Sequence, residues 1–311
     1  MKKRFLNHLF LFILPIIIFT LFVEFYYRTQ TAVVAKRKYI ENNSKNTELL
    51  FLGSSHIAQG INPEYLKKNT MNLANSGQVL PIDYYLFERY IYKMPKVKMV
   101  IVEISPLALY SDFVEGDQMA YLYSNLWDIK YKVDSSSYKN YTILFSAFKL
   151  YALGFLNAVN PLNNETVEIN KYGFTQLPLR GNKFYNLKYD TTSIENLFIM
   201  PHNFKRKEHF RNSKKFLKKI ANECKQKSIK VIFLTTPYYK TYYTHIPEVT
   251  KNEINAMVNT FVKNYGVIYL DLSDGSKIKS LTVKDFEDDH HLNYKGAKKF
   301  TILVDSVINL H

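Results

Sequence analysis

An uncharged apolar stretch from Phe5 to Val23 is the feature that most limits how this chain can fold. Its length is close to the roughly 20 residues that a helix needs to cross the hydrocarbon layer of a membrane. The stretch is apolar all round, which disfavours the alternative of a buried helix in a soluble protein. Because Lys2, Lys3 and Arg4 precede it, the positive-inside rule predicts a cytoplasmic N-terminus.

We expect this segment to be a signal anchor and not a cleaved signal peptide. A cleaved signal has a shorter apolar region followed closely by small residues, whereas Val33-Val34-Ala35 lies about 12 residues downstream. Residues 1–28 are therefore predicted to form a cytoplasmic tip and a transmembrane helix, and residues 29–46 a polar stalk. The protein would be a single-pass protein of the cell membrane, with the remainder of the chain outside the cytoplasm.

Charge and cysteine content narrow the function classes. The 42 Lys and Arg residues exceed the 27 Asp and Glu residues and give a formal net charge of +15, which favours anionic partners. Outside the membrane, such a partner would be an anionic surface or wall polymer and not nucleic acid. The single cysteine, Cys224, excludes an internal disulfide framework and a multi-cysteine metal site.

Much of the positive charge lies between Lys205 and Lys227, where apolar residues recur at helical spacing. This pattern predicts an amphipathic helix with a basic outer face. A solvated face is the plainer interpretation, and contact with anionic headgroups or an anionic polymer is the functional one.

Beyond the stalk, short apolar runs alternate with helical patterns, which is typical of a doubly wound α/β sheet. Strand and turn segments are predicted at 48–56, 71–77, 97–104, 229–235 and 266–272. Helices are predicted at 57–69, 82–94, 207–227, 251–265 and 294–308.

The alternation stops for about a hundred residues in the middle of the chain. We therefore predict an α/β domain in two parts, 47–106 and 207–311, separated by an insertion or cap at 107–206. Insertions of this kind usually pack over the strand ends. Within the insertion, 143–159 is nearly all apolar, but Lys149 at its centre makes a membrane span costly. A buried or membrane-surface helix is favoured over a second span.

Gly53-Ser54-Ser55-His56 ends the first predicted strand. Ligands of open α/β sheets bind beyond the carboxyl ends of the strands, and a Ser in a tight turn entering a helix has an exposed hydroxyl. Taken alone, the segment is more simply a turn with a helix N-cap.

A second candidate segment, Asp288-Asp289-His290-His291, precedes the last predicted helix. A nucleophilic Ser needs a base to take its proton and a carboxylate to orient that base, and an Asp three residues before a His can supply both. An acidic helix cap and a metal site are the alternatives. Adjacent residues rarely converge on one ion without helical spacing, so no metal is expected here.

A third segment, Asn75-Ser76-Gly77, follows the second predicted strand. The bare backbone N–H of Gly77 could approach a developing oxyanion there. The same residues could equally form an ordinary turn.

Together, these three segments resemble the SGNH/GDSL hydrolase superfamily over about 48–106 and 207–311. The resemblance implies a flavodoxin-like three-layer α/β/α fold, with Ser55 as nucleophile, His291 as base and Asp288 as the orienting carboxylate. The oxyanion donors would be the Ser55 and Gly77 amides, with Asn75 as a further candidate.

One departure from that superfamily concerns the third strand. The family usually carries Gly-x-Asn-Asp there, with the Asn side chain as an oxyanion donor, whereas this chain reads Glu103-Ile104-Ser105-Pro106. Losing one such donor costs on the order of 10²–10³ in rate.

The layout of anchor, Gly-Ser-Ser start, insertion and final Asp-x-x-His also resembles extracytoplasmic SGNH-like proteins of surface-polymer acylation. These include the teichoic acid D-alanyl transfer protein and alginate O-acetyltransferase accessory proteins. The resemblance implies a serine-dependent O-acyltransferase or esterase, without a cofactor, acting on acyl esters, above all acetyl esters, of a surface polysaccharide or wall polymer. The alternative is a non-catalytic accessory protein that binds polymer or docks on a membrane-bound O-acyltransferase.

Overall fold

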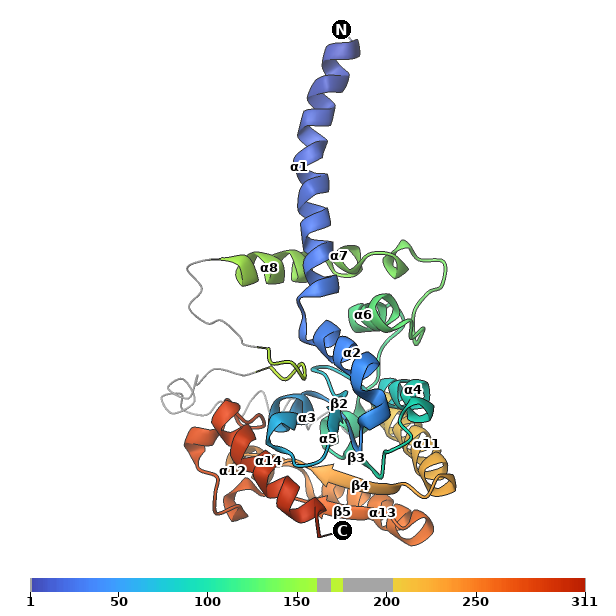
Figure 1. Ribbon diagram of the computed structural model, residues 1–311, viewed down its shortest axis with the longest axis vertical. Coiled ribbons are helices and arrows are strands. Elements are labelled where there is room, and N and C mark those ends of the chain that lie inside the picture. The colour runs from blue at the N-terminus through green and yellow to red at the C-terminus, as the bar shows by residue number, and fades with distance from the viewer. Residues whose placement is uncertain (1, 161–168, 176–203, 311) are drawn as a thin grey trace. The chain divides into compact units, whose positions relative to one another are not determined.

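The computed structural model describes residues 2–160, 169–175 and 204–310 (Figure 1). Its contacts divide the chain into two compact units, one formed by 1–37 with 113–166 and the other by 38–112 with 167–311. The predicted insertion at 107–206 therefore contributes to both units. Its segments 161–168 and 176–203 lie outside the described residues.

The first unit is helical. Its elements are α1 (Lys2–Thr29), the start of α2 (Ala32–Asn43), α6 (Gln118–Trp127), η4 (Tyr138–Asn140), α7 (Ile143–Ser146) and α8 (Phe148–Val159). Within the described residues, α1 is the one helix long and apolar enough to cross a membrane. Most of its apolar side chains from Phe5 to Phe25 are exposed, as expected of a helix in contact with lipid, whereas Val23 is buried.

The predicted apolar segment 143–159 forms two helices and not one. A break at Ala147 separates α7 from α8, and α8 has only 12 residues, too few to span a membrane. Figure 1 shows α8 lying across α1. The Phe155 ring meets the rings of Phe19 and Tyr26 at centroid distances of 6.0 and 5.5 Å.

The second unit contains a five-stranded parallel sheet in the order β2-β1-β3-β4-β5. The strands are β1 (Leu49–Leu52), β2 (Thr70–Asn72), β3 (Met99–Glu103), β4 (Lys230–Thr235) and β5 (Ile268–Asp271). All four pairings are parallel. This strand order is that of flavodoxin-like folds, in which ligands bind where the order reverses, beside the first strand. The predicted fold class is confirmed.

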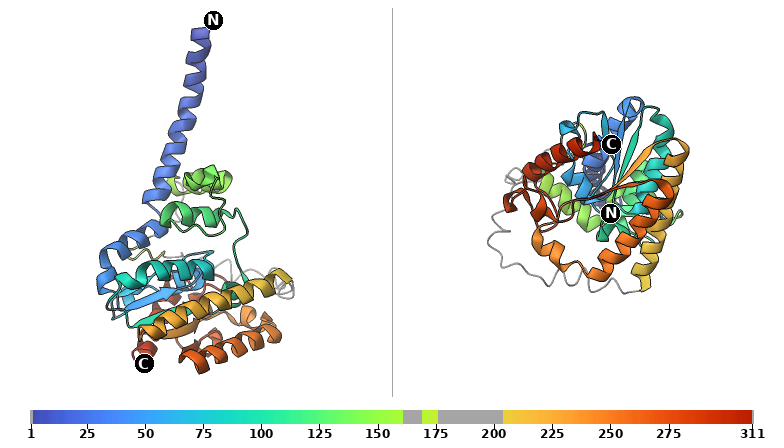
Figure 2. Two further views of the ribbon diagram at one scale, coloured as in Figure 1. Left: turned by 90° about the vertical axis from the view of Figure 1, so that its right-hand side faces the viewer. Right: turned by 90° about the horizontal axis from the view of Figure 1, so that it is seen from below.

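Helices cover both faces of the sheet. They are α3 (Ser55–Gly60), η2 (Pro63–Tyr65), α4 (Leu80–Tyr90), η3 (Ile91–Lys93), α5 (Pro106–Tyr110), α11 (Phe204–Gln226), α12 (Lys240–His245), α13 (Glu248–Tyr265) and α14 (Tyr294–Ile308), with short turns η1 (Ser44–Asn46), η6 (Gly275–Lys277) and η7 (Val283–Asp285). Helix α11 packs against α4, α5 and α13, and α14 packs against α3. Figure 2 shows α4, α11 and α13 on the same side of the sheet.

The predicted helix at 57–69 was too long. The structure ends α3 at Gly60, because Pro63 lacks a backbone N–H and restricts Asn62 to an extended backbone. The Asn62 side chain then accepts a hydrogen bond from the Glu64 amide and caps η2. The chain thus leaves α3 early and returns sooner to β2.

The predicted amphipathic character of the basic helix is confirmed. Helix α11 buries an apolar stripe against the sheet domain and exposes most of its basic side chains. Cys224 lies in that stripe with no exposed surface, and burial raises the pKa of its thiol to about 12. Cys224 therefore behaves as a small apolar residue.

Strand β1 is buried along its whole length, as is β3. The last residue of β3 is the carboxylate Glu103, which is 1% exposed. A buried carboxylate must be paired or hydrogen-bonded to be tolerated. Its partners are Ser54 and His56, which follow β1, and Ser105, which follows β3, so the candidate site begins at the carboxyl ends of these two strands.

Candidate active site

The turn after β1 brings Ser55 to the carboxyl edge of the sheet. Gly53 has a φ of +151°, and a Cβ atom on it would lie 2.6 Å from the Glu103 Cβ and 2.9 Å from Ile57. Only glycine fits this close approach. Ser54 is the N-cap residue and Ser55 is the first residue of α3, so the Ser55 hydroxyl stands at the strand–helix junction.

The loop from Asp288 to His291 forms the opposite side of the site. An antiparallel bridge between Phe286 and Leu292 closes the loop at its base, and both of these side chains lie in the core. The Tyr239 amide donates to the Asp289 carbonyl at 2.8 Å. The loop is therefore anchored at its base and at its tip, immediately before α14.

The structure brings three of the predicted residues into one hydrogen-bonded chain. The Ser55 Oγ lies 2.8 Å from the His291 Nε2, and the His291 Nδ1 lies 2.8 Å from the Asp288 Oδ2. The Asp288 Oδ1 also accepts the His291 backbone amide at 2.7 Å. Because the carboxylate takes the Nδ1 hydrogen, the Nε2 is left as the acceptor for the serine hydroxyl.

Burial and neighbouring groups shift the pKa values of His291 and Asp288 in directions that suit proton transfer from a serine. Burial lowers the pKa of His291, and electrostatic interactions with the imidazoles of His290 and His56 lower it further, although Asp288 opposes them. His291 is therefore neutral near pH 7 and able to accept a proton. Partial burial alone would raise the pKa of Asp288, but hydrogen bonding to His291 and the nearby imidazoles lower it, so the carboxylate stays ionised.

Glu103 holds in place the turn from Gly53 to Ser55 (the serine turn). Its carboxylate accepts the Ser54 amide at 2.6 Å, the Ser54 hydroxyl at 2.9 Å, the Ser105 hydroxyl at 2.7 Å and the His56 Nδ1–H at 2.8 Å. Burial alone would raise the pKa of Glu103, but the electrostatic interaction with His56 and these hydrogen bonds lower it to about 2. The carboxylate fixes the backbone directly before Ser55.

A second buried acidic side chain, Asp83 of α4, supports the same turn. Asp83 accepts the Gly53 amide at 2.8 Å and the Gln78 side chain at 2.5 Å through its Oδ1. Burial raises its pKa to about 8, although these hydrogen bonds oppose the shift. Asp83 thus links the serine turn to the loop that follows β2.

That loop carries the predicted oxyanion residues. The Asn75 amide donates to the Gly53 carbonyl at 3.3 Å, and the Gln78 amide donates to the Asn75 carbonyl at 3.0 Å, so the loop is a tight turn beside the serine turn. Gly77 has a φ of +71°, which favours glycine at this position. Within the described residues, the Ser55 and Gly77 amides make no backbone hydrogen bond, so both donors are open to a ligand.

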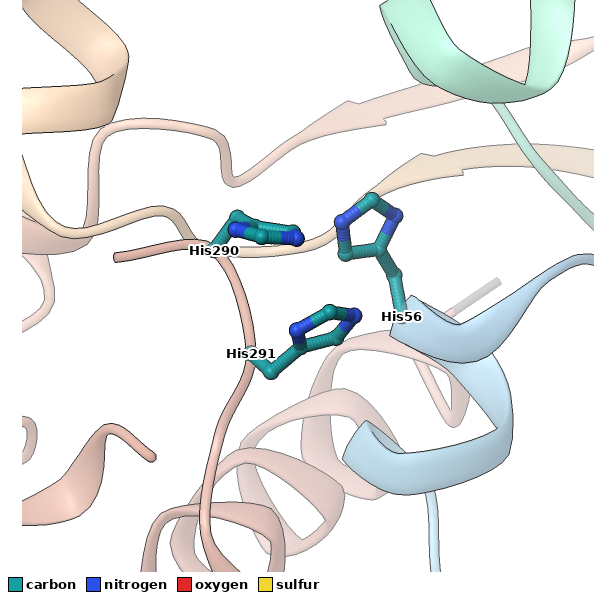
Figure 3. Close-up of side chains that lie close together, drawn as sticks. All are labelled: His56, His290 and His291. Atoms are coloured by element: carbon teal, nitrogen blue, oxygen red, sulfur yellow. The ribbon is translucent and has the colours of Figure 1, made fainter. Parts of the chain in front are cut away.

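Two further histidines line the site (Figure 3). The His56 ring stacks on the His291 ring at a centroid distance of 5.1 Å, and the His290 ring lies 4.0 Å from the His291 ring. His56, the residue after Ser55, hydrogen-bonds to the Glu103 carboxylate through its Nδ1. The His290 Nδ1 lies 2.6 Å from the Asp289 Oδ1, and the Tyr242 ring stacks on the far side of His290.

Sequence reasoning missed Glu103 and Asp83 as parts of the site. In the sequence, Glu103 stands out only as a departure from a family pattern. Its signal was present: a carboxylate inside an otherwise apolar run, Met99–Glu103, that was predicted to be buried needs partners nearby. No comparable signal marks Asp83, which lies within an ordinary amphipathic helix.

Comparisons with known proteins add little to this geometry. No curated protein matches the chain. A protein-family model that carries no descriptive name matches residues 177–311, less than half of the chain.

Solved structures that resemble this one include a GDSL-like lipase from Bacteroides thetaiotaomicron, at 10% identity and a TM-score of 0.41, over 89% of this chain and 98% of that one. The lipase/acylhydrolase from Enterococcus faecalis matches at 12% identity and a TM-score of 0.37, over 84% of this chain and 95% of that one. Scores of this size carry no weight for function.

Proposed function

We propose that this protein is a membrane-anchored serine hydrolase or O-acyltransferase of SGNH type, which works through an acyl-enzyme at Ser55. The observation that carries the proposal is the chain from the Ser55 Oγ through both nitrogens of His291 to Asp288, with both contacts at 2.8 Å. These three groups come from two elements separated by more than two hundred residues of sequence. Their alignment matches what proton transfer from a serine hydroxyl requires.

The geometry fits a two-step acyl transfer. The Ser55 oxygen attacks the ester carbonyl carbon while the His291 Nε2 takes its proton, and Asp288 stabilises the resulting imidazolium. The tetrahedral intermediate then collapses, and His291 returns the proton to the departing alcohol. In the second step, a glycan hydroxyl or water gives its proton to His291 and attacks the acyl-enzyme, which frees Ser55.

The backbone amides of Ser55 and Gly77 are the donors for the oxyanion in this proposal, with the Asn75 side chain as a third. The turn that contains Gly77 is tied to the serine turn by the Asn75 amide and by a hydrogen bond from the Gln59 Nε2 to the Ser76 Oγ at 3.2 Å. Donors fixed in this way need no reorganisation as charge develops, which is the basis of their contribution to the rate.

For the substrate, we propose acyl esters, above all acetyl esters, on a cell-surface polysaccharide or wall polymer. The net charge of +15 and the exposed basic side chains of α11 support an anionic polymer as the neighbour. The predicted anchor, which would place the site outside the cytoplasm, supports the same class of acceptor.

A non-catalytic role is the second candidate, and one observation favours it. The end of β3, where an amide donor is expected in SGNH hydrolases, holds the carboxylate Glu103 and the hydroxyl of Ser105, which is hydrogen-bonded to that carboxylate. An accessory protein that binds polymer or docks on a membrane-bound O-acyltransferase needs no such donor.

Turnover of an aryl acetate by the full-length protein in detergent tests the proposal. We expect hydrolysis by the wild type and a loss of activity on the order of 10⁴-fold or more in Ser55→Ala and in His291→Ala, because the two act as a unit. Ser306→Ala, an exposed serine of α14, is the matched control and should keep full activity. Equal activity in Ser55→Ala and Ser306→Ala would exclude the serine mechanism.

We also propose that α1 spans the membrane with its N-terminus in the cytoplasm. Glu24 supports an outer boundary near the end of α1, since its carboxylate accepts the Ile143 and Leu144 amides at 2.9 to 3.1 Å and pairs with Arg28 at 2.7 Å. The helix from Phe5 to Val23 covers about 28 Å at 1.5 Å per residue, close to the thickness of the hydrocarbon layer.

Helix α8 lies against the outer end of that span and is proposed to rest in the membrane surface. The side chains of Leu150, Leu153 and Leu156 are each about half exposed, and Phe148 and Val159 are 53% exposed. The opposite side of α8 contacts α1 through Tyr151, whose ring meets that of Tyr27 at 4.8 Å. The apolar surface of α1 and that of α8 are therefore continuous, and lipid would cover both.

A further inference from the structure

Three imidazoles converge beside Ser55, and the serine mechanism uses only one of them. His56 comes from α3, whereas His290 and His291 come from the loop before α14. Each ring offers one nitrogen, and these nitrogens lie within 4.8 Å of one another. Figure 3 shows the three rings close together. His56 joins the two adjacent histidines from a distant part of the chain.

Each of the three rings is backed by its own carboxylate. The Nδ1 atoms of His56, His290 and His291 lie 2.8, 2.6 and 2.8 Å from carboxylate oxygens of Glu103, Asp289 and Asp288, respectively. A carboxylate that takes the Nδ1 hydrogen leaves Nε2 as a lone-pair donor and raises its basicity. This is the arrangement that surrounds histidines bound to metal ions.

The His56 Nε2 has no hydrogen-bond partner within the described structure. The His56 side chain is only 1% exposed, so water does not satisfy this atom from the surface. A buried polar atom without a partner costs about 1–3 kcal/mol. The three ring nitrogens and the three carboxylates that back them form a site that a cation would complete.

We propose that the Nε2 atoms of His56, His290 and His291 bind one divalent transition-metal ion of the Zn²⁺ type. Three neutral imidazoles suit Zn²⁺, whereas Mg²⁺ and Ca²⁺ take oxygen ligands. Zn–N bonds of about 2.0–2.1 Å place ligand atoms of a tetrahedral site about 3.4 Å apart. Because one nitrogen of each ring already lies within 4.8 Å of the others, rotations and small shifts of the side chains close the site.

Metal binding and the proposed serine mechanism exclude each other, and this consequence rests on the proposed function. The lone pair on the His291 Nε2 that accepts the Ser55 hydroxyl at 2.8 Å is the same lone pair that the metal would take. With the ion bound, Ser55 has no base and keeps its proton. The ion is therefore a reversible inhibitor, and its removal restores the hydrogen bond without any covalent change.

Direct zinc binding tests the site independently of activity. The full-length Ser55→Ala protein in detergent, freed of metal with EDTA and dialysed, is titrated with ZnCl₂ at pH 8 against a chromophoric chelator. We expect one Zn²⁺ per chain, unaffected by excess MgCl₂. Replacing one ligand, in His56→Gln or His290→Gln, should weaken binding at least about 100-fold, at the upper end of the loss caused by removing a supporting residue.

A matched control lies on α11, where His209 faces Asp112 at 4.0 Å away from the cluster. His209→Gln should bind Zn²⁺ as tightly as the parent. His290 is 20% exposed, so its variant is expected to fold even if the variant at the buried His56 does not, and circular dichroism checks both. No binding by the parent, or equal binding by the parent and His290→Gln, would overturn the proposal.

Labelling of Ser55 with a fluorophosphonate separates this inference from the proposed function. Zn²⁺ should protect Ser55 in the wild type, EDTA should restore labelling, and His290→Gln should lose the protection, measured as a ratio within each variant. Labelling that is unchanged or accelerated by bound Zn²⁺ overturns the inhibitory role. If the wild type is not labelled in the absence of metal, the proposed function is refuted. The zinc titration then tests by itself whether the three histidines bind a metal ion.

Discussion

The substitution Glu103→Gln tests whether Glu103 holds the serine turn in place. The two oxygens of Glu103 accept from the Ser54 amide, the Ser54 and Ser105 hydroxyls and the His56 Nδ1–H. A glutamine has the same shape but only one accepting oxygen. In one orientation its NH₂ group faces the Ser54 amide, a donor fixed in the backbone. In the other orientation the NH₂ group faces the donors of His56 and Ser105.

The magnitude follows from this mismatch. At least one hydrogen bond to a charged acceptor is lost, which costs about 1.5–3 kcal/mol, and at least one buried donor is opposed, which adds about 1–3 kcal/mol. We expect a loss of about 3 kcal/mol in the free energy of unfolding. For a domain of this size, that corresponds to a fall of about 6–12 °C in Tm. Aryl acetate turnover should fall at least about tenfold, because the backbone before Ser55 is no longer fixed.

Glu248→Gln is the matched control, since the Glu248 side chain is 78% exposed and pairs with Lys251 at 2.8 Å. An exposed pair of this kind contributes less than about 1 kcal/mol. Calorimetric scans of the wild type and both variants in the same detergent give the comparison. If Glu103→Gln melts within about 1 °C of Glu248→Gln, Glu103 does not support the turn as described.

Three further predictions concern pH and the membrane. The acid limb of kcat/KM should lie below the usual His pKa of about 6.5, because burial and the neighbouring imidazoles lower the pKa of His291. His290→Gln should move that limb to higher pH, because it removes one of the groups that lower this pKa. An acid limb above 6.5 would contradict this. Asp83 is protonated in the folded state up to about pH 8 but only up to about pH 4 when unfolded, so its contribution to stability falls as pH rises between these values. Asp83→Asn should flatten the pH dependence of unfolding over that window, and parallel curves for variant and wild type would refute the assignment. A fluorophore on Leu153→Cys in α8 should be quenched by nitroxide lipids, whereas one on Val249→Cys, an exposed residue of α13, should not, and equal quenching would exclude contact between α8 and lipid.

The parts of the fold that the sequence predicts well are those governed by local periodicity. The strands and the last helix, 294–308, were placed closely because buried parallel strands are continuous apolar runs and because Asn293 caps α14 through the Lys295 and Gly296 amides. Helix α3 was predicted too long, since the helical pattern continues past Pro63 while the backbone cannot.

The candidate site likewise has residues that the sequence predicts and residues that it does not. Ser55, Asp288 and His291 are predictable because the required residue types occur at the required ends of elements. The roles of Glu103 and Asp83 are not predictable, because they depend on which side chains meet across the sheet edge. The approach of His56 to His290 likewise follows from the packing of α3 against α14 and from no spacing in the sequence.

Covalent labelling of Ser55 tests the central claim most directly. The full-length protein without metal is treated with a fluorophosphonate, and the modified residue is located by peptide mass spectrometry. The account predicts one adduct, on Ser55, that is absent from Ser55→Ala and strongly reduced in His291→Ala because the hydroxyl loses its base. Ser54 should remain unmodified, since Glu103 holds its hydroxyl in the interior. An adduct on Ser54, or no adduct on any serine of the folded protein, would contradict the assignment of Ser55 as an activated nucleophile.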